Sequence, residues 1–252
     1  KPGNNTNAPQ ATDLSPISAL INRTPGTKQA RPPRPNGIFT MDTRLAKQAR
    51  QLNMRNGGPN CPIPPIVLMT DDQRLPNPRP AIAGLPRRSI VIFRHYGLGT
   101  ADRAKLAYNV RRLCRKHDHL CLIANDLALA LKLDADGVHF PEYRIQKTPH
   151  IFGQVPDGML VTSACHSIKT LRRLSMLAPW QLPNGVLISP VFPTQSHPGQ
   201  PGMSFQLFLQ CAALCQSIGL APIALGGIKT NNVENLQRSA VASLAGIGFS
   251  AK

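Results

Sequence analysis

Short runs of apolar, β-branched residues recur along the chain from residue 64 onward. Each run has the length and composition of a strand that is buried on both faces. Polar and turn-forming residues separate the runs. The pattern predicts strands at Ile66–Met69, Ile90–Phe93, Leu120–Ala124, Gly137–Phe140, Met159–Thr162, Gly185–Ser189, Pro222–Leu225 and Leu244–Gly248.

Helical periodicity fills most of the intervals between these runs. Within Asp102–His117, the residues Leu106, Val110 and Leu113 fall on one helical face. Strands that alternate with helices indicate a parallel sheet, because each parallel return needs a crossover. Eight such strands predict an α/β fold, a compact (β/α)8 TIM barrel over residues 64–252. The other predicted helices are Asp126–Leu133, Ser167–Leu177, Ser204–Ser217 and Asn231–Ser239.

Two segments precede the predicted barrel. Residues 1–40 are rich in Asn, Pro and Arg, which predicts a flexible, disordered basic extension. Residues 41–63 are predicted to hold an accessory helix and a linker. No helical pattern follows the last strand, so we expect the accessory helix to cover the barrel surface there. Its apolar stripe consists of Met41, Leu45, Ala49 and Leu52.

The chain carries 29 Lys and Arg against 12 Asp and Glu, a formal net charge of +17. The excess is spread along the chain, with +7 in residues 1–60 and +10 in the remainder. Such a surface attracts phosphorylated small molecules, nucleic acid or anionic lipid. Nucleic acid is not expected as a partner, because residues 1–37 contain no aromatic side chains for base stacking.

Composition also bears on the compartment. The sequence has no apolar run of about 18 residues, which argues against a membrane partner. Six cysteines without disulfide-like spacing are typical of a cytoplasmic protein with free thiols. The sequence does not determine the oligomeric state, and a homo-oligomer is compatible with it.

Polar residues follow the predicted strands at the positions where barrels of this type hold their functional groups. Arg94 follows the second strand, Asn125 and Asp126 follow the third, and His166 follows the fifth. An arginine, an aspartate and hydroxyls around one rim suit a metal–phosphate substrate. After the seventh strand, the pair Gly226-Gly227 lets backbone N–H groups approach an anion.

Several of these segments resemble, in order and spacing over residues 64–250, the thiamine phosphate synthase and thiazole tautomerase family. The resemblance implies a small (β/α)8 barrel, in agreement with the pattern of strands and helices. The segments are Leu68-Met69-Thr70-Asp71, Ala124-Asn125-Asp126, Ala135-Asp136-Gly137-Val138-His139, His166-Ser167, Ser189-Pro190-Val191-Phe192-Pro193-Thr194 and Ala224-Leu225-Gly226-Gly227-Ile228.

The resemblance implies a transferase of thiamine biosynthesis. A synthase of this family joins a hydroxymethylpyrimidine diphosphate to a thiazole phosphate and releases pyrophosphate. Its expected partners are therefore small phosphorylated pyrimidine and thiazole substrates, with Mg²⁺ as cofactor. By the same resemblance Arg94 is a catalytic contact of the diphosphate, Asp126 is a magnesium ligand, and the substrate-binding residues are Asn125, Thr194, Ser196, His197, Gly227, Phe249 and Ser250.

The chain also departs from the synthase pattern. Tyr96 stands where the pattern has a lysine, and Arg144 stands where it has a second metal-binding aspartate. Further along, His197 replaces a lysine and Ala164 replaces a serine. A single carboxylate holds Mg²⁺ weakly. Glu142 is therefore predicted as the second metal ligand, unless Arg144 binds the diphosphate in place of metal.

Two alternatives to a synthase remain open. The resemblance also covers thiazole tautomerases, in which a histidine at the position of His166 transfers a proton. Histidine suits this chemistry near neutral pH, so His166 is a catalytic candidate. The other alternative is a catalytically weakened barrel that binds a phosphorylated ligand, or nucleic acid, through its basic surface.

Overall fold

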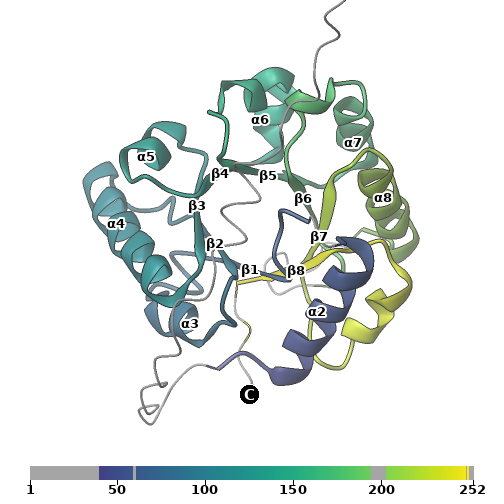
Figure 1. Cartoon of the computed structure of the whole chain (residues 1–252), viewed down its shortest axis with the longest axis horizontal. Coiled ribbons are helices and arrows are strands. Elements are labelled where there is room, and N and C mark those ends of the chain that lie inside the picture. Colours follow the sequence, from purple (N-terminus) through teal and green to yellow (C-terminus); the bar gives the residue numbers. More distant parts are fainter. Residues whose placement is uncertain (1–39, 59–60, 194–202, 248, 250–252) are drawn as a thin grey trace, which may run out of the picture.

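The computed structural model describes residues 40–58, 61–193, 203–247 and 249. Its strands are all parallel and close into a barrel in sequence order, so that the eighth strand pairs with the first. Figure 1 shows them as an inner ring with the helices outside, which confirms the predicted (β/α)8 barrel. The strands are β1 (Ile66–Met69), β2 (Ile90–Phe93), β3 (Leu120–Ala124), β4 (Gly137–Phe140), β5 (Leu160–Cys165), β6 (Gly185–Ile188), β7 (Ala221–Leu225) and β8 (Ser243–Gly246).

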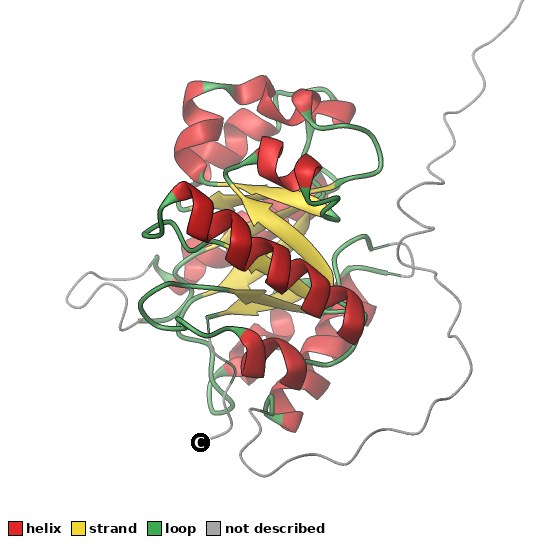
Figure 2. Cartoon of the chain, turned by 90° about the vertical axis from the view of Figure 1, so that its left-hand side faces the viewer, coloured by secondary structure: helices red, strands yellow, loops and turns green. Residues whose placement is uncertain are grey.

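Helices cover the outer faces of the strands, as the side view in Figure 2 shows. The long helices lie where the periodicity predicts them. The predicted helix at 231–239 is instead a short 3-10 helix, because its buried residues, Val233 and Leu236, are three positions apart, the repeat that a 3-10 helix aligns. The helices are α2 (Thr43–Asn56), α3 (Arg79–Gly84), α4 (Thr100–His117), α5 (Leu127–Lys132), α6 (Glu142–Lys147), α7 (Ile168–Leu174) and α8 (Phe205–Ser217), and the 3-10 helices are η1 (Pro149–Gln154), η2 (Pro179–Gln181) and η3 (Val233–Arg238).

The helix α2 packs beside β8 and covers the barrel there, as predicted (Figure 1). The Asp42 carboxylate accepts hydrogen bonds from the backbone N–H groups of Arg44 and Leu45 and so caps the first turn. At the other end, the Asn53 side chain donates to the carbonyl of Ala242, at 2.9 Å, and fixes α2 to the chain that leads into β8. The helix is therefore part of the barrel's own core.

Two apolar cores result from the alternation of side chains along the strands. One fills the barrel interior and includes Val67, Ile92, Leu122 and Leu187. The other lies between the strands and the surrounding helices. The interior core fills the barrel, so the barrel is a packed core and not a channel. Among the described residues, no helix is long and apolar enough to cross a membrane.

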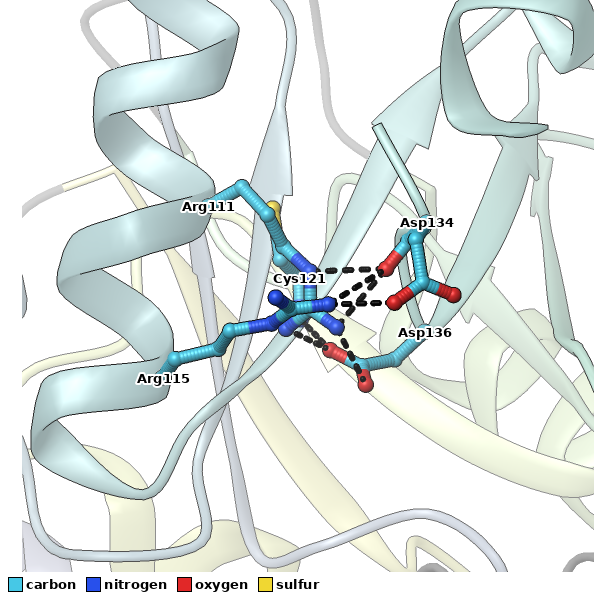
Figure 3. Close-up of polar contacts among 5 residues, drawn as sticks. All are labelled: Arg111, Arg115, Cys121, Asp134 and Asp136. Atoms are coloured by element: carbon cyan, nitrogen blue, oxygen red, sulfur yellow. Dashed lines mark hydrogen bonds and ion pairs between the residues drawn. The ribbon is translucent and has the colours of Figure 1, made fainter. Parts of the chain in front are cut away.

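A network of charged groups fastens α4 to the strands at the amino-terminal end of the barrel (Figure 3). Arg111 forms an ion pair with Asp136, with 2.8 Å between Nη1 and Oδ2, and also donates to the Asp134 carbonyl. The Asp136 carboxylate accepts in turn from the backbone N–H of Cys121 at 2.7 Å. Arg115 pairs with the Asp134 side chain. This end of the barrel is therefore structural.

Candidate functional site

The carboxyl ends of the strands carry the predicted site residues, and the parallel barrel brings these ends to one rim. We call this rim the mouth. It is formed by Arg94 after β2, Asn125 and Asp126 after β3, His166 after β5, Ser189 after β6 and Gly227 after β7.

Arg94 presents a partly accessible cation at the mouth. Its side chain is 29% exposed, and Nη2 lies 3.7 Å from Oδ2 of Asp71. Its guanidinium carbon also lies 5.8 Å from the centre of the Tyr96 ring. These contacts are long and the side chain is partly exposed, so the Arg94 guanidinium can still accept an anion.

The Asp71 carboxylate that faces Arg94 is ionised. Burial by itself would raise its pKa, but hydrogen bonds from the backbone and side chain of Arg74 outweigh burial and lower the pKa below its ordinary value. Asp71 thus shares its charge between two arginines, which leaves Arg94 only partly neutralised.

His139 lies beneath these groups, at the end of β4, and is buried. Full burial, assisted by the nearby charges of Arg94 and His166, lowers the pKa of His139 to about 3. Its Nδ1 lies 3.0 Å from the Thr162 hydroxyl. His139 is therefore neutral at physiological pH. It forms a polar floor beneath the mouth.

Asp126 is engaged by residues of two helices. One carboxylate oxygen accepts from the backbone N–H of Leu129 at 2.9 Å and caps α5. The other oxygen accepts from Nη1 of Arg103, on α4, also at 2.9 Å. The neighbouring Asn125 has a positive φ of 56° and donates from Nδ2 to the Tyr143 hydroxyl at 2.8 Å.

Glu142, the other predicted metal ligand, begins α6 and accepts a hydrogen bond from the Ser167 hydroxyl at 3.2 Å. The two carboxylates thus have different partners. No group of three or more His, Cys, Asp or Glu side chains that could hold a metal ion occurs among the described residues. What argues against a Mg²⁺ ion at Asp126 is the contact with Arg103, which places a positive charge where the ion would bind, while the other Asp126 oxygen caps α5.

His166 is exposed at the mouth and anchored through one ring nitrogen. Its Nδ1 lies 3.0 Å from the carbonyl oxygen of Ser189 and 3.1 Å from the hydroxyl of the same residue. Because a carbonyl only accepts, Nδ1 carries a proton and donates it to Ser189. Nε2 takes no part in these contacts.

Gly227 needs to be glycine for two reasons. Its φ is +63°, and a Cβ there would lie 2.5 Å from the Pro193 carbonyl oxygen. The chain after β6 packs directly on this turn, with the Phe192 N–H donating to Gly226. Phe249 is buried against Gly246 and anchors the chain after β8. Thr194, Ser196, His197 and Ser250 lie outside the described residues.

Arg103 and Tyr143 belong to the mouth but were not predicted as site residues from the sequence. Arg103 lies inside a predicted helix, where an arginine is usually a solvated surface residue. The one available signal was its place in the first turn after the loop that follows Arg94. A separate hollow of about 490 Å³, lined by Phe192, Phe205 and residues of η3, contains none of the predicted site residues.

The fold and the mouth together define a class: a parallel (β/α)8 barrel with arginine, amide and histidine side chains at the carboxyl ends of its strands. Residues 79–248 match the protein family described as thiamine monophosphate synthase, and the chain belongs to this family.

Comparison with individual proteins gives the same family. The chain is 28% identical over 148 residues to the thiamine-phosphate synthase of Chromobacterium violaceum, covering 58% of this chain and 67% of that one. It is 24% identical over 163 residues to the thiamine-phosphate synthase of Fusobacterium nucleatum, covering 63% and 74%. Among solved structures, the thiamine phosphate pyrophosphorylase from Pyrococcus furiosus matches with a TM-score of 0.54 and 18% identity, over 71% of this chain and 83% of that chain. At this identity the structural likeness supports the fold alone.

Proposed function

We propose that this chain is a thiamine phosphate synthase, a transferase that acts in thiamine biosynthesis on a pyrimidine diphosphate and a thiazole phosphate at the mouth of the barrel. Family membership supports the reaction class. The reaction is assigned to the mouth because Arg94 provides a partly accessible guanidinium at the carboxyl end of β2.

In the reaction, the bond between the pyrimidine methylene carbon and the diphosphate oxygen breaks, and its electron pair leaves with pyrophosphate. The thiazole nitrogen then donates its lone pair to the methylene carbon. Negative charge grows on the leaving group, and Arg94 is placed to stabilise it through charge-assisted hydrogen bonds. Asn125, held by Tyr143, lies on the next strand end and orients the substrate beside Arg94.

The thiazole phosphate is assigned to the turn at Gly227 on the family resemblance alone. The space that a side chain would take at Gly227 is filled by the chain at Phe192 and Pro193. The predicted phosphate contacts of Thr194, Ser196, His197 and Ser250 remain predictions. Mg²⁺ also remains a prediction of the family resemblance, and no step above depends on it.

The test is product formation by the purified protein. We expect both substrates to give thiamine phosphate and pyrophosphate in equal amounts, and Arg94→Ala to lower the rate by about 10²–10³-fold. Arg87→Ala is the matched control, because the Arg87 side chain is 81% exposed and pairs with Asp118 at the opposite end of the barrel. Absence of product, or equal rates for the two variants, would contradict the proposal.

A thiazole tautomerase is a second candidate, because Ser189 holds His166 through Nδ1 and the contact leaves Nε2 unengaged at the mouth. In that case His166→Ala would lower the rate of thiazole aromatisation by about 10²–10⁴-fold. Aromatisation that persists in His166→Ala, or that the wild type does not catalyse, would exclude this candidate.

A further inference from the structure

Arg103 is held at the mouth by three hydrogen bonds. Nε donates to the carbonyl of Arg94 at 3.1 Å, Nη2 to the carbonyl of Ala124 at 2.8 Å, and Nη1 to Asp126 at 2.9 Å. Its guanidinium carbon lies 5.6 Å from the ring centres of both Phe93 and Tyr96. With only 11% of the side chain exposed, Arg103 is a fixed part of the structure.

The guanidinium of Arg103 places a permanent positive charge beside the Asp126 carboxylate. The carboxylate oxygen that would bind a metal ion accepts from Arg103, and its other oxygen caps α5. A divalent cation at Asp126 would have to approach a guanidinium that is already fixed there, and like charges at this range repel strongly. The other predicted metal ligand, Glu142, accepts instead from Ser167, and Arg144 stands where the synthase pattern has its second metal-binding aspartate.

We propose that Arg103 replaces a metal ion as the counter-cation of Asp126, and that the mouth binds a pyrophosphate group through Arg94 without protein-bound Mg²⁺. Arg103 is a positioning residue in this scheme. It neutralises Asp126, which would otherwise repel the ligand, and it fixes the backbone carbonyl of Arg94. The inference rests on the proposed function, because that function supplies the diphosphate ligand.

The experiment is calorimetric titration of the purified full chain with inorganic pyrophosphate, in EDTA and in Mg²⁺. We expect the wild type to bind in EDTA and Asp126→Asn to bind in EDTA as well. Arg103→Ala exposes the Asp126 carboxylate, so it should bind at least tenfold more weakly in EDTA and recover affinity when Mg²⁺ is added. This gain of a metal response is a readout that loss of packing alone would not produce.

Two further variants keep the test decisive. Arg112→Ala is the matched control on the same helix, where Arg112 contacts only Tyr108 among the interactions described, and it should behave as wild type. If Arg103→Ala does not fold, Arg103→Lys keeps one charge at Asp126 and is expected to bind in EDTA. Wild-type binding that requires Mg²⁺, or an Arg103→Ala protein without a metal response, would overturn the inference and leave the proposed function standing. No pyrophosphate binding in either buffer would overturn both.

Discussion

Arg111 and Asp136 form an ion pair that is largely withdrawn from water, with Nη1 and Oδ2 separated by 2.8 Å and each side chain only 10% exposed. The pair joins the middle of α4 to the segment that enters β4. Because Asp136 also accepts from the Cys121 backbone at the start of β3, one carboxylate holds a helix and two strands together.

We predict that Arg111→Met destabilises the protein by about 3–5 kcal/mol, because it leaves the buried Asp136 carboxylate without its counter-charge. The free energy of unfolding in urea is the measurement. Arg112→Met is the control on the exposed face of the same helix, and it should stay within about 0.5 kcal/mol of wild type. Equal effects of the two variants would show that the ion pair has no special role.

The accessory helix gives a second prediction. Leu52 lies on the buried face of α2, so Leu52→Ala should lower the free energy of unfolding by about 2–5 kcal/mol. Met54, two residues further on, is 80% exposed, and Met54→Ala should change it by no more than about 0.5 kcal/mol. If Leu52→Ala were as mild as Met54→Ala, α2 would not belong to the barrel core.

A third prediction concerns the turn at Gly226 and Gly227, after β7. In Gly227→Ala the new methyl group meets the Pro193 carbonyl at a positive φ, which should cost about 1–3 kcal/mol of stability. Titration with thiazole phosphate should also show weaker binding. Gly153→Ala, where a Cβ meets no atom within 4 Å, is the control and should be neutral in both assays. Unchanged binding in Gly227→Ala would remove this turn from the site.

The buried histidines predict how stability depends on pH. Burial lowers the pKa of His139 to about 3 and that of His119 to about 4, whereas an unfolded histidine titrates near pH 6.5. The unfolded chain therefore binds more protons than the folded chain below about pH 6.5. Stability should be full above that pH and fall on acidification toward pH 4, by about 1.4 kcal/mol per pH unit for each histidine.

Urea unfolding at a series of pH values tests this dependence. His139→Gln should flatten the slope between pH 6 and pH 4 by roughly the share of one histidine. His119→Gln should flatten the slope as well, because burial also lowers the pKa of His119. A slope in His139→Gln equal to that of wild type would mean that His139 is not held neutral in the folded state.

Much of the fold could be predicted from the sequence, because parallel strands buried on both faces leave continuous apolar runs. The stripe of Leu45, Ala49 and Leu52 likewise identified α2. The short helices α3 and α6 were not predicted, since six residues with one or two buried apolar positions contain no helical period.

The site was predictable only in part. Strand ends place Arg94, Asp126 and His166 at one rim, whatever the details of the loops. Their partners depend on how the loops turn: the positive φ of Asn125 directs it to Tyr143, and the first turn of α4 brings Arg103 to Asp126. Neither pairing has a signature in residue spacing, because each joins groups from separate elements.

We infer above all that the mouth of this barrel receives phosphorylated substrates at Arg94. A crystal structure of the protein grown with pyrophosphate and thiazole phosphate tests it most directly. We expect one anion within about 3 Å of the Arg94 guanidinium and a second at the Gly227 turn. Anions bound only elsewhere on the basic surface, with the mouth free of both ligands, would contradict the account.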